Sequence, residues 1–231
     1  MNSSTFRSMR LIVASALCFL LAPTTKAQFS IMPDQTATDL LQAMTGQNVV
    51  ISNETLTCMD TANAIFNFTG SALGISDGIL LYTGRVDQIS NPWNFALTHV
   101  NNTPGDANVT ATVGFGTFDA CALEFDVVAA YDTLFLRYVV GSDEYPEYSC
   151  SYFGDHLGFF INGGGYVDSN FAQFPDTNIY VTGARIACPY DTFAFQYYVD
   201  NYVQQVPDIA FDGYSLPIES SILVTLAITL R

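Results

Sequence analysis

Basic residues are scarce in this sequence, and their scarcity limits what the protein can bind. The only lysine is Lys26, and the chain beyond it holds four arginines against 22 acidic residues, a net charge of −18 for residues 28–231. Nucleic acids and anionic membrane surfaces both attract clusters of lysine and arginine. We therefore expect neither as a partner. Divalent cations, neutral sugars and other proteins are compatible with this charge.

The sequence also lacks an apolar run long enough to span a bilayer, which takes about 20 residues. The apolar stretch Leu11–Leu21 follows Arg7 and Arg10 and is itself followed by small residues. This order is typical of a secretory signal peptide. We predict that residues 1–27 are a signal peptide and that residues 28–231 are a single extracellular β-rich domain, secreted or at the cell surface. No transmembrane segment is expected after removal of the signal.

Zinc-binding cysteine patterns are absent as well. No two cysteines are spaced C-x-x-C, and no histidine lies at zinc-finger spacing from a cysteine, which argues against a structural zinc site. An even number of cysteines in an exported chain favours disulfides instead. Two disulfides with three possible pairings are expected among the four cysteines beyond the signal, which are Cys58, Cys121, Cys150 and Cys188.

The hydrophobic pattern predicts an all-β fold with one short N-terminal helix. Capping residues from Asp34 to Thr38 precede "TDLLQAM", and Gly46 follows it, as expected for a helix. Two β-rich runs within residues 122–141 predict a hairpin that turns at residues 130–132. Many short strands at roughly 8–12-residue spacing indicate a β-sandwich or jelly-roll-like architecture. Further strands are expected at residues 48–58, 64–70, 78–84, 111–118, 156–167, 177–183, 191–201 and 221–231.

Acidic residues cluster in "GSDEYPEYSCSYFGDHLGFFING". Asp143, Glu144 and Glu147 lie within five residues, and Asp155 precedes the next apolar run. Calcium takes six to eight oxygen ligands in flexible geometry, and a bend in the chain would let these four carboxylates supply several of them. The spacing differs from that of an EF-hand loop. A solvated turn with Arg137 as counter-charge is the structural alternative, and a catalytic pair of acids is the third.

Two patterns resemble catalytic motifs. Glycoside hydrolysis uses two carboxyl groups across a sugar-sized cleft, and Glu144 or Glu147 would be the candidates. "GISDG" matches the G-x-S-x-G motif, but a nucleophilic serine requires a strand-to-helix turn, whereas the residues after Ser76 read as a strand. We therefore favour a protein without catalytic residues, and keep a secreted carbohydrate-binding or glycan-hydrolysing protein that uses the same acidic cluster as the alternative.

Several motifs, in order, resemble the choice-of-anchor L domain, a family of exported bacterial surface domains. They are "LGISDGILLYTG", "GDANV", "DACALEFDVVAAYDTLFLRYVVGSDEYPEY", "FGDHLGFFING", "YYVDN" and "FDGYS". The resemblance covers about residues 40–226, and "RYVVGSDEYPEY" is its most specific part. It implies an extracellular β-rich module used in adhesion or surface display, with no established catalytic activity. It also places the candidate metal ligands at Asp143, Glu144, Glu147 and Asp155, with Asp106 of "GDANV" as a weaker addition.

These observations together predict a non-enzymatic secreted or cell-surface β-sandwich for adhesion or surface assembly. A divalent cation, Ca²⁺, is expected to stabilise it at the acidic cluster. The expected partner is an extracellular protein or glycan. Self-association through edge strands, which offer unpaired backbone groups to a second copy, is a further hypothesis.

Overall fold

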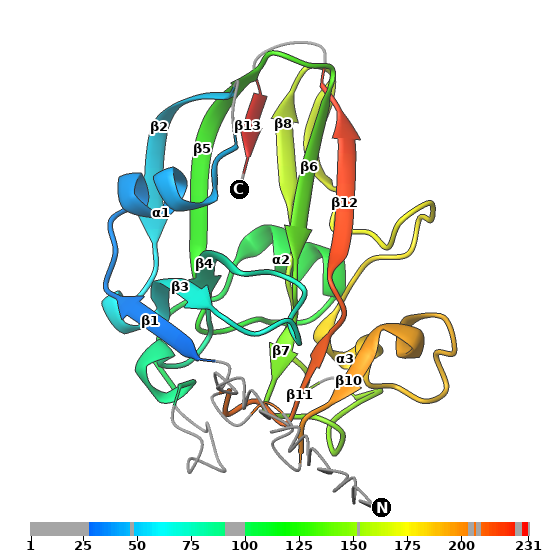
Figure 1. Ribbon diagram of the computed structural model, residues 1–231. Helices are drawn as coiled ribbons and strands as arrows, with labels where there is room; N and C mark the ends of the chain where they lie inside the picture. The colour runs from blue at the N-terminus through cyan, green and yellow to red at the C-terminus, as the bar shows by residue number, and fades with distance from the viewer. Residues whose placement is uncertain are drawn as a thin grey trace, which may run out of the picture.

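The computed structural model describes residues 28–46, 49–90, 100–151, 153–202, 206, 209–224 and 228–230. The predicted signal peptide lies outside the described residues. Strands arranged in antiparallel sheets make up most of the regular structure, and the helices are short (Figure 1). The expected all-β, sandwich-like fold is therefore confirmed.

The strands are β1 (Phe29–Pro33), β2 (Val49–Thr57), β3 (Asn63–Phe68), β4 (Asp77–Leu81), β5 (Ala122–Ala129), β6 (Thr133–Tyr138), β7 (Gly141–Ser142), β8 (Phe160–Gly163), β9 (Tyr166–Asn170), β10 (Tyr198–Asp200), β11 (Gly213–Ser215), β12 (Ile218–Leu223) and β13 (Ile228–Leu230). The α-helices are α1 (Ala37–Met44), α2 (Ala107–Val113) and α3 (Gly183–Ile186). Short 3₁₀ helices occur at Asp60–Ala62, Val86–Gln88 and Ala194–Tyr197.

The largest sheet has the strand order β2-β5-β13-β8-β9, and the pair β6–β12 lies beside it (Figure 1). Alternate residues of β5 point into the core between them, so that Leu123, Phe125 and Val127 are buried. Leu134 and Leu136 of β6 pack against the same core from the other side. This arrangement is a sandwich, because two sheet layers bury their apolar faces against each other. Two smaller sheets, β1-β3-β4 and β10-β11-β7, extend the fold at the lower end in Figure 1.

The predicted N-terminal helix is confirmed as α1. The Thr36 side chain accepts a hydrogen bond from the backbone N–H of Asp39, and the Asp39 side chain accepts one from the backbone N–H of Thr36. This reciprocal capping box satisfies two amide groups that would otherwise lack partners at the helix start. Leu40 and Leu41 are buried, and they pack α1 onto the main core.

The predicted hairpin of residues 122–141 is wrong in its pairing, although both of its strands exist. β5 pairs with β2 and β13, whereas β6 pairs with β12, so the two consecutive strands belong to different sheets. Residues 130–132 therefore form a connection between the layers of the sandwich. Local alternation of side chains cannot distinguish such a crossing from a hairpin, because both give strands of period two.

Two predicted strands are also wrong. Residues 107–113 form α2, which overlaps the strand expected at 111–118; the Asp106 Oδ1 atom caps its start, and Gly114 ends it with a left-handed φ of 82°. Both are standard helix-terminus signals that the strand interpretation overlooked. Residues 177–183 contribute only the isolated bridge of Tyr180 to Gln173. By contrast, "GILLYTG" begins as strand β4, so the residues after Ser76 form no nucleophile-bearing helix.

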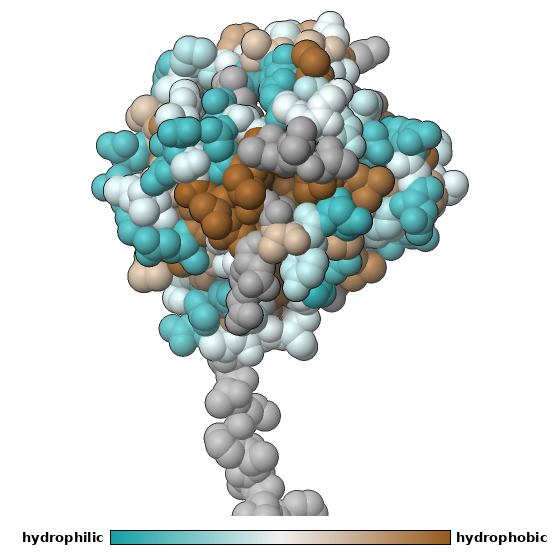
Figure 2. All heavy atoms as spheres, turned by 90° about the horizontal axis from the view of Figure 1, so that it is seen from above, coloured by the Kyte–Doolittle hydropathy of each residue, from teal (hydrophilic) through white to brown (hydrophobic). Residues whose placement is uncertain are grey.

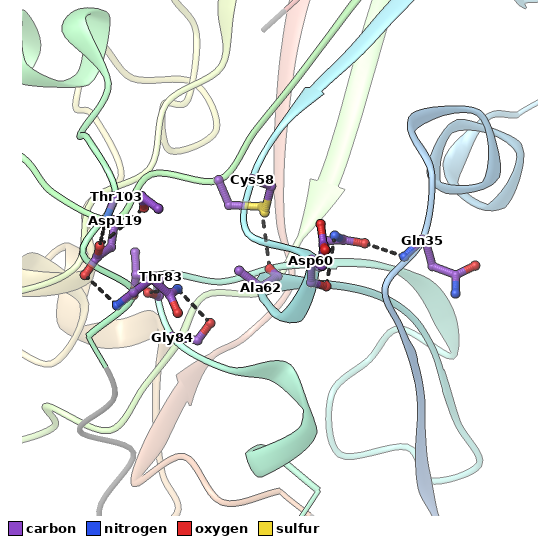
Figure 3. Close-up of a disulfide and its surroundings, with 11 residues drawn as sticks. Gln35, Cys58, Asp60, Ala62, Thr83, Gly84, Thr103 and Asp119 are labelled. Atoms are coloured by element: carbon purple, nitrogen blue, oxygen red, sulfur yellow. Dashed lines mark hydrogen bonds between the residues drawn. A yellow bond between two sulfur atoms is a disulfide. The ribbon is translucent and has the colours of Figure 1, made fainter.

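The four described cysteines form two disulfides, as expected. Cys58 pairs with Cys121, and Cys150 pairs with Cys188. The first joins the end of β2 to the residue before β5 and lies near a polar network drawn in Figure 3. The second joins residues 143–150, which follow β7 and are called the acidic turn, to the segment after α3.

The upper end of the sandwich exposes apolar side chains. Figure 2, which looks down on that end, shows apolar side chains gathered within a more polar rim. Val50 and Val128 face each other across the β2–β5 pair, and they are 67% and 51% exposed. Leu223, at the end of β12, is 62% exposed.

Candidate functional site

The small sheet β10-β11-β7 brings acidic residues from two distant parts of the chain, residue 143 and residues 200–212, to one edge. Gly213 is in register with Ser142 of β7 on one side and with Asp200 of β10 on the other. Asp143 directly follows β7 and Asp212 directly precedes β11, and the charge of Asp143 contributes to the raised pKa of Asp212. Like charges held close together repel each other and disfavour the charged forms of the carboxyl groups. This edge therefore carries an electrostatic cost.

Tyr145 anchors the acidic turn that follows β7. Its side chain is 1% exposed, its ring packs edge-on against Tyr198, and its hydroxyl donates a 2.7 Å hydrogen bond to the carbonyl oxygen of Gly183. Gly183 in turn donates its N–H to the carbonyl oxygen of Asp155 at 3.0 Å. A Cβ at Gly183 would lie 2.5 Å from that oxygen, so this close approach requires glycine. The contacts fix Glu144 and Asp155 on neighbouring pieces of backbone.

Two of the predicted site residues, Glu144 and Asp155, have pKa values raised above those of ordinary carboxyl groups. Burial raises the pKa of Glu144 to about 7, and the nearby charges of Asp155 and Asp143 add to the rise, while a hydrogen bond from the backbone of Asp155 partly offsets it. The Glu144 Oε2 atom is buried without a hydrogen-bond partner among the described residues. Burial also raises the pKa of Asp155, and a 3.1 Å hydrogen bond from the Thr83 hydroxyl partly offsets that rise. The charges of two predicted ligands, Asp143 and Asp155, thus both act on a third, Glu144.

Asp212 and Asp200 extend the cluster, and the sequence interpretation missed both as site residues. Burial raises the pKa of Asp212 to about 6, with added contributions from the charges of Asp143, Glu147 and Asp200. Glu147, the fourth predicted ligand, is exposed to solvent. The two missed residues lie in "YYVDN" and "FDGYS", motifs that carry the family resemblance. We refer to Asp143, Glu144, Glu147, Asp155, Asp200 and Asp212 as the acidic group.

A network of hydrogen bonds holds Thr83, the residue that donates a hydrogen bond to Asp155 of the acidic group. Thr83, which binds Asp155, lies in a loop whose carbonyl oxygens at Thr83 and Gly84 accept hydrogen bonds from the Asn101 side chain. Asp119 accepts hydrogen bonds from the backbone N–H groups of Asn101 and Thr103 (Figure 3). The Asn101 side chain thus binds the backbone at Thr83 and Gly84, while Asp119 binds the backbone of Asn101. These hydrogen bonds hold the Thr83 hydroxyl in position to donate to Asp155. Asp106, the weaker candidate ligand, instead caps α2.

The described arginines do not neutralise the acidic group. Arg85, Arg137 and Arg185 form ion pairs with Asp87, Glu219 and Asp191 respectively, all of which lie outside the group. The carboxylates are not, however, arranged as a ready-made metal cage. Across the part of the chain that the structure describes, no group of three or more His, Cys, Asp or Glu side chains has its atoms placed to hold a metal ion.

The raised pKa values predict how stability depends on pH without divalent cations. Between pH 4.5 and 7 the folded protein keeps a proton on Glu144 that the unfolded chain releases, so its stability should fall as pH rises through this window. We expect a loss of about 1 to 2 kcal/mol, after allowing for solvent screening of the half-buried side chain. Thermal melting in EDTA measures it. Glu144→Gln should flatten the profile, whereas Glu219→Gln should not; an unchanged profile in Glu144→Gln would contradict the assignment.

An acidic, disulfide-bonded all-β domain with a partly buried group of carboxylates is the class that the fold and site define. Within this class, the chain belongs to the choice-of-anchor L domain family, whose model matches residues 28–229. No curated protein and no solved structure matches it. The predicted family is thus confirmed, and it makes this chain a surface-associated β-domain of a cell-surface or secreted protein. None of the helices in the described ranges is long and apolar enough to cross a membrane.

Proposed function

We propose that the acidic group binds a divalent cation, calcium, and that the ion holds together the segment of residues 143–155 that follows β7. In this proposal the protein is a non-enzymatic surface module for adhesion or surface assembly, and calcium keeps it rigid outside the cell. Like charges gathered in a partly buried place cost free energy unless protons or a cation offset them.

The observation that carries the proposal is the buried Glu144 Oε2 atom, which has no hydrogen-bond partner among the described residues. An unsatisfied buried oxygen of a carboxylate is costly, and a bound cation would satisfy it. Glu144 also lies within the electrostatic influence of Asp143 and Asp155. These three carboxylates, with Glu147 from the same turn, are the residues that would hold the ion.

The ligand chemistry favours calcium over other common ions. The acidic group offers only oxygen atoms, and calcium accepts carboxylates in variable number and geometry, whereas magnesium requires a stricter octahedron. Zinc sites in proteins use cysteine and histidine prominently. The four described cysteines are in disulfides. Since the side chains do not form a cage as they stand, binding would require them to turn inward, which the tolerance of calcium permits.

A calcium titration of thermal stability tests the proposal. A ligand that binds only the folded state at a concentration 100 times its Kd stabilises it by about 2.7 kcal/mol, or roughly 5–10 °C for a chain of this size. We expect such a rise in Tm at pH 7.5 with calcium, a smaller one with magnesium, and reversal by EDTA. Glu144→Gln combined with Glu147→Gln should abolish the rise, whereas Glu219→Gln should retain it. A full response in the double variant would refute the assigned ligands.

Glycan hydrolysis by the acidic group is the competing proposal, and the same variants distinguish it. Because burial raises the pKa of Glu144 to about 7, this side chain holds a proton near neutral pH, as a general acid must. Release of reducing sugar from a glycan panel that is lost in Glu144→Gln would favour an enzyme. Calcium-dependent stability without turnover would favour the surface module.

A further inference from the structure

A groove separate from the acidic group lies between strands β6 and β12 and the loop of residues 173–178. Its volume is about 440 Å³, which is within the range of sites for small organic ligands. The yellow segment that follows β9 extends outward beside β12 in Figure 1. We call this the β12 groove. Its lining residues come from β6, from β12 and from residues 173–178, and none of them belongs to the acidic group.

Phe135 gives the groove an open aromatic surface. It is 66% exposed on the outer face of β6, and it lies in register with Ser221 of β12, a small residue that leaves the ring uncovered. No ring contact involves Phe135 among the described residues. An exposed aromatic ring beside a cavity offers its electron-rich face to a ligand rather than to the core.

Polar side chains form most of the remaining lining, and they combine acceptors with donors. Asp176 and Glu219 supply carboxylates, while Gln173 and Asn178 supply amides. Asp176, Asn178 and Glu219 are exposed, so their polar atoms are open to a ligand. Glu219 lies 3.8 Å from Arg137, which orients it along the outer face of the strand pair.

The loop beside β12 is held in place before any ligand arrives. The Ser220 hydroxyl donates a 2.7 Å hydrogen bond to the carbonyl oxygen of Gln173, and so ties the loop to the strand. Within the loop, the Thr177 hydroxyl donates to the carbonyl oxygen of Phe174 and accepts from the N–H of Ile179. Phe174 is 1% exposed and packs between Phe193 and Tyr197. A preorganised groove binds a ligand with less loss of conformational entropy.

We propose that the β12 groove binds a neutral glycan, with a pyranose ring stacked on Phe135 and its hydroxyl groups bonded to the carboxylates and amides around it. The C–H groups on one face of a pyranose suit the negative face of an aromatic ring. Its hydroxyls both donate and accept, which matches carboxylates together with amides. An anionic sugar is disfavoured, because Asp176 and Glu219 face the groove. The proposal supplies an adhesion ligand without depending on the cation.

Titration of the full mature chain with neutral hexasaccharides of glucose, mannose, galactose and xylose tests this inference, with polygalacturonate as the anionic comparison. EDTA is present throughout, so that glycan binding is measured without calcium. The result then does not depend on whether the acidic group binds calcium. We expect binding of at least one neutral hexasaccharide and none of polygalacturonate. Phe135→Ala should weaken the binding about tenfold, and Asn178→Ala should also weaken it. Leu223→Ala, which changes an exposed apolar residue of β12 outside the groove lining, should leave it unchanged.

Both groove variants lie on the surface, so their Tm should match that of the parent chain. Absence of binding to every neutral hexasaccharide at millimolar concentration would overturn the inference. So would preferential binding of polygalacturonate, or neutral binding that Phe135→Ala leaves intact. Neutral binding that is lost in Glu144→Gln but kept in Phe135→Ala would move the sugar site to the acidic group and equally overturn the β12 groove.

Discussion

Replacement of Cys150 and Cys188 together by alanine is expected to lower the free energy of unfolding by about 4 kcal/mol, which corresponds to a fall in Tm of roughly 10 °C. The disulfide spans a sequence separation of 38 residues, and its loss frees the unfolded chain to adopt more conformations. It also releases the acidic turn, because Cys150 follows Glu147 by three residues and is joined to the segment after α3. Denaturant unfolding monitored by far-UV circular dichroism measures the loss.

The second disulfide provides the matched control. Cys58 and Cys121 are separated by 63 residues, so their replacement by alanine should cost a similar amount of stability through chain entropy. Only the Cys150 and Cys188 variant should also weaken the calcium response, because only that disulfide begins in the acidic turn. Equal calcium responses in the two variants would show that the turn does not need its disulfide to hold the ion.

Replacement of Tyr145 by alanine is expected to cost about 3 to 5 kcal/mol. The side chain is 1% exposed, and its removal would leave a large cavity against Tyr198 and detach the turn from Gly183. Tyr145→Phe keeps the ring and removes only the hydroxyl, which leaves the buried carbonyl oxygen of Gly183 without this donor and should cost about 1 to 3 kcal/mol. Thermal and denaturant unfolding of both variants provide the measurement.

The two tyrosine variants also separate packing from hydrogen bonding at the acidic group. Tyr145→Phe should retain most of the calcium response, because the ring still positions Glu144. Tyr145→Ala should lose the response even where the variant remains folded. An equally small cost for both changes would mean that the ring does not hold the turn.

Sequence patterns predict the parts of this fold that depend on local chemistry. The capping residues around Thr36 identify α1, and alternation with flanking glycine identifies β3, β4 and β8. The partner of a strand is not a local property, and for this reason β5 and β6 are misread as a hairpin although they lie in different sheets. Helix α2 is missed because its sequence, "ANVTATV", is rich in β-branched residues, which favour strands over helices. The helix-capping residue Asp106 points the other way, but it is a weaker signal than the propensity of the whole segment.

In the candidate site, too, the residues that are close in sequence are predicted and those brought in by strand pairing are not. Asp143, Glu144 and Glu147 are visible as a cluster because they are close in sequence, and Asp155 because it follows within the same motif. Asp200 and Asp212 reach the group only through the pairing of β10, β11 and β7. A register between strands more than 50 residues apart cannot be inferred from one sequence. The predicted signal peptide and the single-domain boundary remain predictions.

Calorimetric titration of the metal-free protein with calcium at pH 7.5 tests the central claim most directly. We predict saturable binding of about one ion per chain with a Kd at or below roughly 1 mM, the range of extracellular calcium modules. Asp155→Asn, which preserves the acceptor for the Thr83 hydroxyl, should weaken binding at least about tenfold, the cost of one lost charge–charge contact, whereas Glu219→Gln should not change it. No binding up to about 10 mM calcium, well above that range, or equal binding by Asp155→Asn would contradict a cation site in the acidic group.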